Sequence, residues 1–133
     1  MTIHTTPIVG AFHRPPAQGI LQALSGGQAL RIVPEPENPY DSNALAVFVL
    51  TEALEPGLDD DLDASCQGYG YTANDIRGQE AWHLGYVPAK TAAPLAKEVL
   101  AHYKGNLGDT SVTIEGILTF DAKGKPCVQF SLA

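Results

Sequence analysis

Residues 29–50 read ALRIVPEPENPYDSNALAVFVL and contain two strand-like segments with a turn between them. The first segment, residues 29–33, alternates apolar and polar side chains, which predicts a half-buried strand that ends at Pro34. Residues 44–50 are more continuously apolar and predict a second strand. Between them, residues 38–43 are rich in the Asn, Pro, Asp and Ser residues that favour turns. We therefore expect these strands to form an antiparallel pair.

The residues that precede this pair predict a further strand and a short helix. A first strand is expected over residues 8–12, after a short polar tail, because the prolines that follow cannot donate to a strand ladder. Ile20, Leu21 and Leu24 then recur at helical spacing, and two glycines after them favour a left-handed cap. This pattern predicts a helix over residues 16–25.

An acidic run dominates the next part of the chain. Residues 52–63, EALEPGLDDDLD, hold six acidic side chains and no basic one, whereas the whole chain has 15 acidic and 8 basic residues and a net charge of -7. Without those six acids the chain carries 9 acidic and 8 basic groups, for a net charge of -1. This remainder excludes the basic stripe of a protein that coats DNA, but it does not repel a strand. Residues 51–80 show little periodicity, and we expect them to form a mobile insertion.

The last part of the chain predicts a strand, a helix and a hairpin. Residues 81–87 form the expected strand, which Pro88 closes. A helix should follow in an alanine-rich stretch, because four side chains repeat there at a spacing of three to four: Leu95, Val99, Leu100 and Tyr103. Residues 112–120 and 128–132 then predict two strands joined by a turn at residues 121–125.

A single domain accommodates these elements. A chain of 133 residues with 44% hydrophobic side chains can bury one core, and two cysteines do not suggest a disulfide framework. Roughly six strands and two short helices favour a mainly β fold, namely an OB-like small antiparallel barrel with helices at its margins. The N-terminus lacks a signal-peptide pattern, and no apolar run approaches the roughly 18 residues that span a bilayer. We therefore expect a cytoplasmic protein with no membrane partner.

Three parts of the sequence, in this order, resemble one known family. They are residues 9–12 with Arg14 after them, residues 31–44 with the pattern E-P-x-N-P-Y-D-x-N-A, and residues 84–88 before an alanine-rich helix. Together they resemble the HIRAN domain family, in particular its free-standing bacterial or phage-type members. Other members are fused to fork-remodelling helicase-like ATPases, so we expect DNA repair as the process and a separate helicase or nuclease protein as a partner. Replication restart, restriction and a phage function stay open as alternatives to repair. It covers residues 8–50 and 81–132 and has no counterpart for the insertion.

The resemblance implies an OB-like barrel that recognises the free 3′-hydroxyl end of single-stranded DNA, as in the eukaryotic members of the family. The residues expected to contact DNA lie in or near the matching segments. They are Phe12, His13, Arg14, Arg31, Asn38, Tyr40, Asp41, Tyr86, Lys90 and Phe130. Since the sequence has none of the common catalytic or metal-binding motifs, we expect no catalytic residue, metal ligand or cofactor.

The chemistry of two adjacent side chains agrees with this implication. An ionised carboxylate only accepts hydrogen bonds, so Asp41 suits a terminal hydroxyl and repels a phosphate at the same place. Tyr40 offers a flat face for the last base, and such stacking is worth about 1 to 3 kcal/mol. The basic residues nearest the family segments are Arg14, Arg31 and Lys90. They allow about two or three phosphate contacts, which predicts that the affinity for DNA depends only weakly on salt.

Each of these residues also has a structural explanation. Asn38, which would otherwise hold the sugar or a base edge, and Asp41 are typical of turns, where their side chains accept from nearby backbone amides. Phe12, Tyr86 and Phe130 lie in predicted strands, and core packing fits their pattern as well as base contact does.

Two other classes of function compete with DNA binding. In the stronger alternative, the exposed groove or the acidic insertion binds a basic protein partner. A metal-dependent hydrolase or nuclease is less favoured, because no catalytic or zinc-binding motif occurs and the acidic run lacks the order of a calcium loop. The obvious candidates for acid–base or metal chemistry are His13, Asp41 and His83. We therefore expect no enzymatic activity, while the oligomeric state stays open because no heptad is evident.

Overall fold

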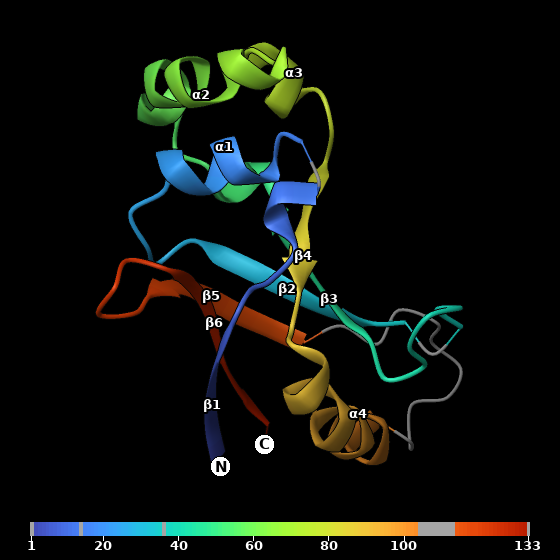
Figure 1. The fold of residues 1–133 in the computed structure, drawn as a ribbon. Coiled ribbons are helices and arrows are strands. Elements are labelled where there is room, and N and C mark those ends of the chain that lie inside the picture. Colours follow the sequence, from blue (N-terminus) through green and yellow to red (C-terminus); the bar gives the residue numbers. More distant parts are fainter. Residues whose placement is uncertain (1, 14, 36, 104–113, 133) are drawn as a thin grey trace.

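The fold is built on strands, with helices at both ends of the sheet (Figure 1). The computed structural model describes residues 2–13, 15–35, 37–103 and 114–132. These residues form the strands β1 (Thr2–Pro7), β2 (Ala29–Pro34), β3 (Leu45–Leu50), β4 (Ala81–Tyr86), β5 (Ile114–Phe120) and β6 (Pro126–Leu132). They also form the α-helices α1 (Ala17–Ala23), α2 (Asp59–Cys66), α3 (Ala73–Arg77) and α4 (Ala89–Tyr103), and the 3-10 helices η1 (Ala11–His13), η2 (Thr51–Ala53), η3 (Pro56–Leu58) and η4 (Gln67–Tyr69). None of the described helices is both long and apolar enough to cross a membrane.

One antiparallel sheet contains all the described strands, in the order β1-β6-β5-β2-β3-β4. β2 and β3 pair as predicted, with Arg31 opposite Phe48, and the turn at residues 38–43 lies between them. β5 and β6 form the predicted hairpin around residues 121–125. Because β2 also pairs with β5, the two hairpins join into a single sheet. The prediction of a mainly β class is confirmed.

The sheet is open, so the prediction of a small closed barrel is wrong. β1 and β4 lie at its two edges. Among the described residues, a single isolated bridge between Val9 and Tyr86 links the segment after β1 to β4. Gly10 follows with a φ of +85°, which turns the chain out of the extended conformation and prevents a ladder from continuing there. The OB-like character of the fold stays a prediction.

The N-terminal strand is also displaced from its predicted position. Residues 2–7, expected to be a polar tail, form β1 and pair with β6 along their whole length. Residues 8–12 leave the strand and enter η1. Threonine fits a pleated surface well, and Thr6 is only 2% exposed while its neighbour Thr5 faces solvent. A polar sequence therefore forms an edge strand here, because β6 provides a ready partner.

The core lies between the sheet and the helices that cover it. Its strand members are fully buried aliphatic side chains such as Leu30, Ile32, Val47, Leu118 and Val128. α1 and α4, both predicted from helical spacing, add Ile20 and Val99 to the same core. In Figure 1, α1, α2 and α3 are stacked at one end of the sheet and α4 lies at the other end.

Residues 51–80 are folded into short helices, whereas the sequence predicts a segment of little periodicity. They include α2 and α3 and bury several side chains in the main core: Leu54, Leu62, Cys66, Ala73 and Ile76. α2 packs closely on α1, because a Cβ on Gly19 would lie 2.6 Å from the carbonyl oxygen of Ser65. The mobility of this segment stays a prediction, and its packing gives it a structural role.

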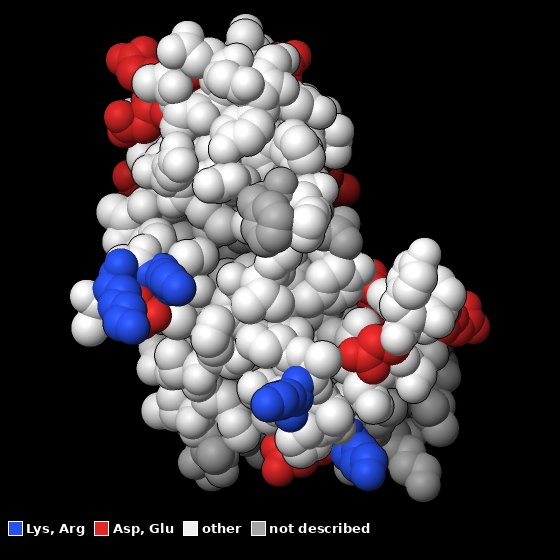
Figure 2. Space-filling model, in the orientation of Figure 1, with Lys and Arg blue, Asp and Glu red and all other residues white. Residues whose placement is uncertain are grey.

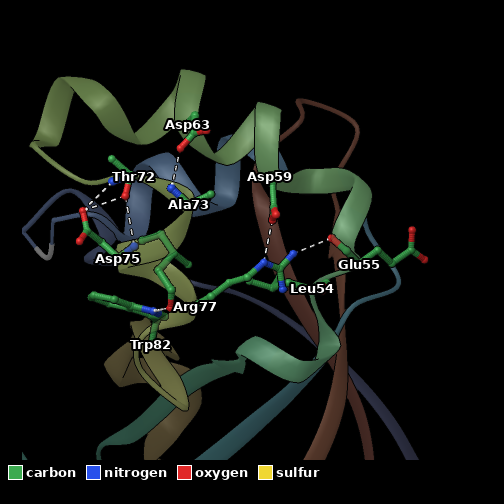
Figure 3. A network of polar contacts seen from close by, with 10 residues as sticks. Leu54, Glu55, Asp59, Asp63, Thr72, Ala73, Asp75, Arg77 and Trp82 are labelled. Atoms are coloured by element: carbon green, nitrogen blue, oxygen red, sulfur yellow. Dashed lines mark hydrogen bonds and ion pairs between the residues drawn. The ribbon is translucent and has the colours of Figure 1, made fainter.

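Polar contacts hold the acidic part of this segment in place (Figure 3). The guanidinium of Arg77 donates to Asp59 at 2.7 Å, and to two backbone carbonyls of the preceding segment at 3.0 and 2.8 Å. Asp63 accepts from the backbone nitrogen of Ala73 at 2.6 Å. Two of the six acidic side chains of residues 52–63 therefore make contacts inside the fold.

Candidate functional site

The turn between β2 and β3 is held by its own polar side chains. Oδ1 of Asn38 accepts hydrogen bonds from the backbone nitrogens of Tyr40 (2.9 Å) and Asp41 (3.2 Å). Oδ1 of Asp41 accepts from the backbone nitrogen of Asn43 at 2.9 Å. Asn38 therefore stabilises the turn, as its structural explanation predicts, and it also lines the surface hollow described below. Its expected contact to a sugar or a base edge stays a prediction.

Two groups on this turn stay available to a ligand. The ring of Tyr40 is 95% exposed, although the turn fixes its backbone. The second carboxylate oxygen of Asp41 accepts no hydrogen bond from the described residues. A fixed backbone that presents an exposed ring beside an anionic acceptor is preorganised, because the turn loses little conformational entropy when a ligand binds.

Glu35 connects the turn to β4. Its Oε1 accepts from the amide nitrogen of Asn38 (3.0 Å) and from the hydroxyl of Tyr86 (2.9 Å). The ring of Tyr86 meets His83 edge-on with their centroids 4.8 Å apart, and His83 stacks on Phe48. Glu35 has no role among the predicted contacts, and its place at the head of the E-P-x-N-P-Y-D pattern is the signal that points to it.

A surface hollow of about 280 Å³, which we call the turn hollow, opens beside Tyr40 and Asp41. Tyr86 also lines it, as expected, and so does Val9, which the sequence does not predict. This volume is close to the lower limit for small-molecule sites, roughly 300 Å³. Val9 is held there by backbone hydrogen bonds with Tyr86 at 2.8 and 2.9 Å. Gly85 permits this approach, because a Cβ there would overlap the carbonyl oxygen of Val9.

Three other predicted contact residues do not line this hollow. Lys90 is exposed on the first turn of α4, next to Ala89, which lines the turn hollow. His13 is exposed at the end of η1. Arg31 lies in the middle of β2, half-buried and opposite Phe48, and does not line the turn hollow. Lys90 is therefore the described cation that is closest in sequence to a lining residue.

Phe130 is a core residue rather than part of this site. It is 3% exposed and stacks on His4, with the ring centroids 5.2 Å apart. It belongs to the same cluster of buried side chains as Val128 of the same strand. This burial favours the core-packing explanation, and the expected base contact at Phe130 stays a prediction. The side chain of Phe12 and the whole of Arg14 lie outside the described residues.

Charged side chains are unevenly placed around the site (Figure 2). Acidic side chains gather over α2 and beside the β2–β3 turn, whereas basic side chains gather over α4 and over the β5–β6 turn. In the part of the chain that the structure describes, no three His, Cys, Asp or Glu side chains form a group able to hold a metal ion. A nucleic-acid strand on this surface would meet separate cations rather than a basic stripe.

Comparison with known proteins identifies a family. A family model described as the HIRAN domain matches residues 5–128. A crystal structure of a protein from Lactobacillus plantarum, determined as a structural genomics target, is similar with a TM-score of 0.48 and 18% sequence identity. That match covers 96% of this chain and 92% of the other. No curated protein matches the sequence at a significant level.

Proposed function

Because the chain belongs to the HIRAN domain family, which is known for DNA binding, we propose that it binds the 3′-hydroxyl end of single-stranded DNA. Membership of the family supports a nucleic-acid-binding module in general. The finer assignment rests on one observation, the exposed Tyr40 ring beside the Asp41 carboxylate at the turn hollow. We assign no catalytic step to the chain, and a separate helicase or nuclease protein is the partner that such a module would bring to a DNA end.

The carboxylate of Asp41 separates a hydroxyl from a phosphate by its hydrogen-bonding role and by its charge. A free 3′-hydroxyl donates to the carboxylate oxygen that the turn does not use. A 3′-phosphate is an anion, and two unit charges about 4 Å apart near a protein surface repel each other by about 4 kcal/mol. Glu35, which contacts the same turn, places further negative charge nearby. The site therefore favours strands that end in a hydroxyl.

The ring of Tyr40 supplies contact area that does not depend on the identity of the base. Stacking of a base on an aromatic ring is worth about 1 to 3 kcal/mol, and every base has a face that can stack. Lys90 provides a cation for a phosphate close to the strand end. Each such contact changes the slope of log affinity against log salt by about -0.7, so we expect moderate affinity and a shallow salt dependence.

Fluorescence anisotropy with two short strands, identical except for a 3′-hydroxyl or a 3′-phosphate, tests this proposal. We expect the wild-type protein to prefer the hydroxyl by at least about tenfold, which corresponds to about 1.4 kcal/mol. Asp41→Asn should remove the preference, because it keeps an oxygen for the backbone amide of Asn43 but carries no charge. Asp41→Ala should remove it as well, whereas Ser42→Ala, at an exposed neighbour, should keep it. Equal affinity of the wild type for both strands would overturn the proposal.

A basic protein is the second candidate partner, because part of the acidic run faces solvent. Glu52, Asp60 and Asp61 are exposed, and none of their side chains makes an ion pair with the described residues. Deletion of residues 52–63 is unsuitable as a test, since it removes core side chains such as Leu62. A variant with Glu52→Gln, Asp60→Asn and Asp61→Asn should keep the fold and abolish binding to such a partner. Its affinity for DNA should be unchanged or higher.

A further inference from the structure

A second and larger hollow shares the lining residue Val9 with the turn hollow. Its volume is about 660 Å³, and it is bounded by η1 and α1 on one side and by the β5–β6 turn on the other. We call it the α1 hollow. The residues that matter for its chemistry are Val9, Gln18, Gln22, Phe120 and Lys125. It has more than twice the volume of the turn hollow.

The two hollows adjoin at one residue. Val9 lines both of them and is 43% exposed, so its side chain lies at the surface between them. Its backbone is fixed by the paired hydrogen bonds to Tyr86, so Val9 holds a defined position in the lining of both hollows. Gly10 follows with a positive φ, and a Cβ at that position would meet nothing within 4 Å. Because the two hollows share Val9, a chain molecule bound in one of them has the lining of the other next to it.

The far side of the α1 hollow carries a positioned cation. Oδ1 of Asp121 accepts from the backbone nitrogens of Lys123 (2.8 Å) and Lys125 (2.9 Å), which orders the β5–β6 turn. The backbone amide of Lys125 is the main cause that holds the pKa of Asp121 below its ordinary value, so this carboxylate is ionised at neutral pH. The turn therefore sets two lysines against one carboxylate and carries a net positive charge, and Lys125 is the lysine that lines the α1 hollow.

The remaining lining offers contacts that suit nucleotides. Gln18 and Gln22 are both exposed on α1 and are four residues apart, so their amides lie on the same side of the helix. Glutamine amides donate to phosphate or base oxygens without adding negative charge. Phe120, half-buried at the end of β5, supplies an aromatic ring beside them.

From this arrangement we infer that the α1 hollow holds the nucleotides that precede the terminal one, with Lys125 contacting a phosphate of the strand. The inference rests on the proposed function, because the strand end would occupy the turn hollow. It also fixes the direction of the strand, whose 3′ end lies at Asp41 and whose 5′ part runs past Val9 toward the β5–β6 turn. The chain would then bind several nucleotides rather than a single terminal group.

The test compares a dinucleotide with an octanucleotide, both ending in a 3′-hydroxyl, by fluorescence anisotropy at several salt concentrations. The wild type should bind the longer strand more tightly. Lys125→Gln should reduce the magnitude of the salt slope for the octanucleotide by about 0.7, the change expected for one lost phosphate contact, and leave the dinucleotide unaffected. Gln22→Glu, which places a negative charge in the α1 hollow, should lower the affinity for the octanucleotide and leave the affinity for the dinucleotide unchanged. Lys97→Gln, at an exposed position of α4 that lines neither hollow, is the charge-matched control.

The outcomes distinguish this inference from the proposed function. If Lys125→Gln behaves like Lys97→Gln while the preference for a 3′-hydroxyl persists, the strand does not cross the α1 hollow and the inference fails alone. Equal affinity of the wild type for the dinucleotide and the octanucleotide would also overturn this inference alone. If the wild type binds a 3′-phosphate strand as tightly as the 3′-hydroxyl strand of the same length, the proposed function fails first.

Discussion

The chain enters β3 through one connection and leaves it through another, and different forces hold the two. The turn before β3 is fixed by hydrogen bonds that the side-chain oxygens of Asn38 and Asp41 accept from backbone amides, and it leaves Tyr40 almost fully in solvent. The segment after β3, residues 51–80, is fixed by burial, and its residue Leu62 has no exposed surface. The difference shows that local polar contacts can present functional groups without burying them, whereas the longer connection is part of the core.

The largest change in stability is expected at Leu62, and it tests whether residues 51–80 belong to the core. Leu62→Ala should lower the free energy of unfolding by about 2 to 5 kcal/mol, because it removes a fully buried side chain and leaves a cavity. Urea denaturation measures this change. A loss below about 0.5 kcal/mol, the usual size of a surface substitution, would mean that residues 51–80 behave as the mobile insertion that the sequence predicts.

A smaller loss is expected where α1 and α2 cross. Gly19→Ala should destabilise the fold by about 1 to 3 kcal/mol, because the new methyl group would press on the backbone of Ser65 and the thiol of Cys66. Gly57→Ala is the matched control, since a Cβ there meets nothing within 4 Å. Equal thermal stabilities of the two variants would contradict the close packing of α2 on α1.

On the turn before β3, the effect should appear in binding and not in stability. Tyr40→Ala should weaken the affinity for single-stranded DNA by about 1 to 3 kcal/mol through lost stacking. It should change the free energy of unfolding by no more than about 0.5 kcal/mol, because the ring is exposed. Anisotropy and urea denaturation on the same preparation separate the two effects. Unchanged affinity would assign Tyr40 a purely structural role, and lost stability would contradict its exposure.

Local signals explain which parts of the fold the sequence predicts. The β2–β3 pair and the β5–β6 hairpin are found because each has two strand patterns around a turn. The edge strand β1 is missed because its polar residues become a strand only through β6, which is distant in sequence. In residues 51–80, four apolar side chains occur at every fourth position: Leu54, Leu58, Leu62 and Cys66. This helical period is obscured by the acidic residues, Pro56 and Gly57 between them.

In the candidate site, too, the sequence predicts the residues that lie in local patterns and misses those that depend on distant contacts. Tyr40, Asp41 and Tyr86 do line one hollow, since the family pattern carries them in segments that pair directly. The part played by Val9 depends on a single bridge to β4, and no local pattern predicts such a contact. Phe130 is a candidate contact in the sequence, but in the fold it is 3% exposed and belongs to the core cluster, which no local pattern in β6 reveals.

The central claim is that the carboxylate of Asp41 reads the end of a strand. A crystal structure of the protein with a short 3′-hydroxyl oligonucleotide gives the most direct measurement, the distance from this carboxylate to the terminal 3′ oxygen. We predict about 2.5 to 3.0 Å, the range for a hydroxyl that donates to an oxygen. A strand whose 3′ oxygen lies elsewhere, while Asp41 contacts only the backbone of its own turn, would contradict the claim.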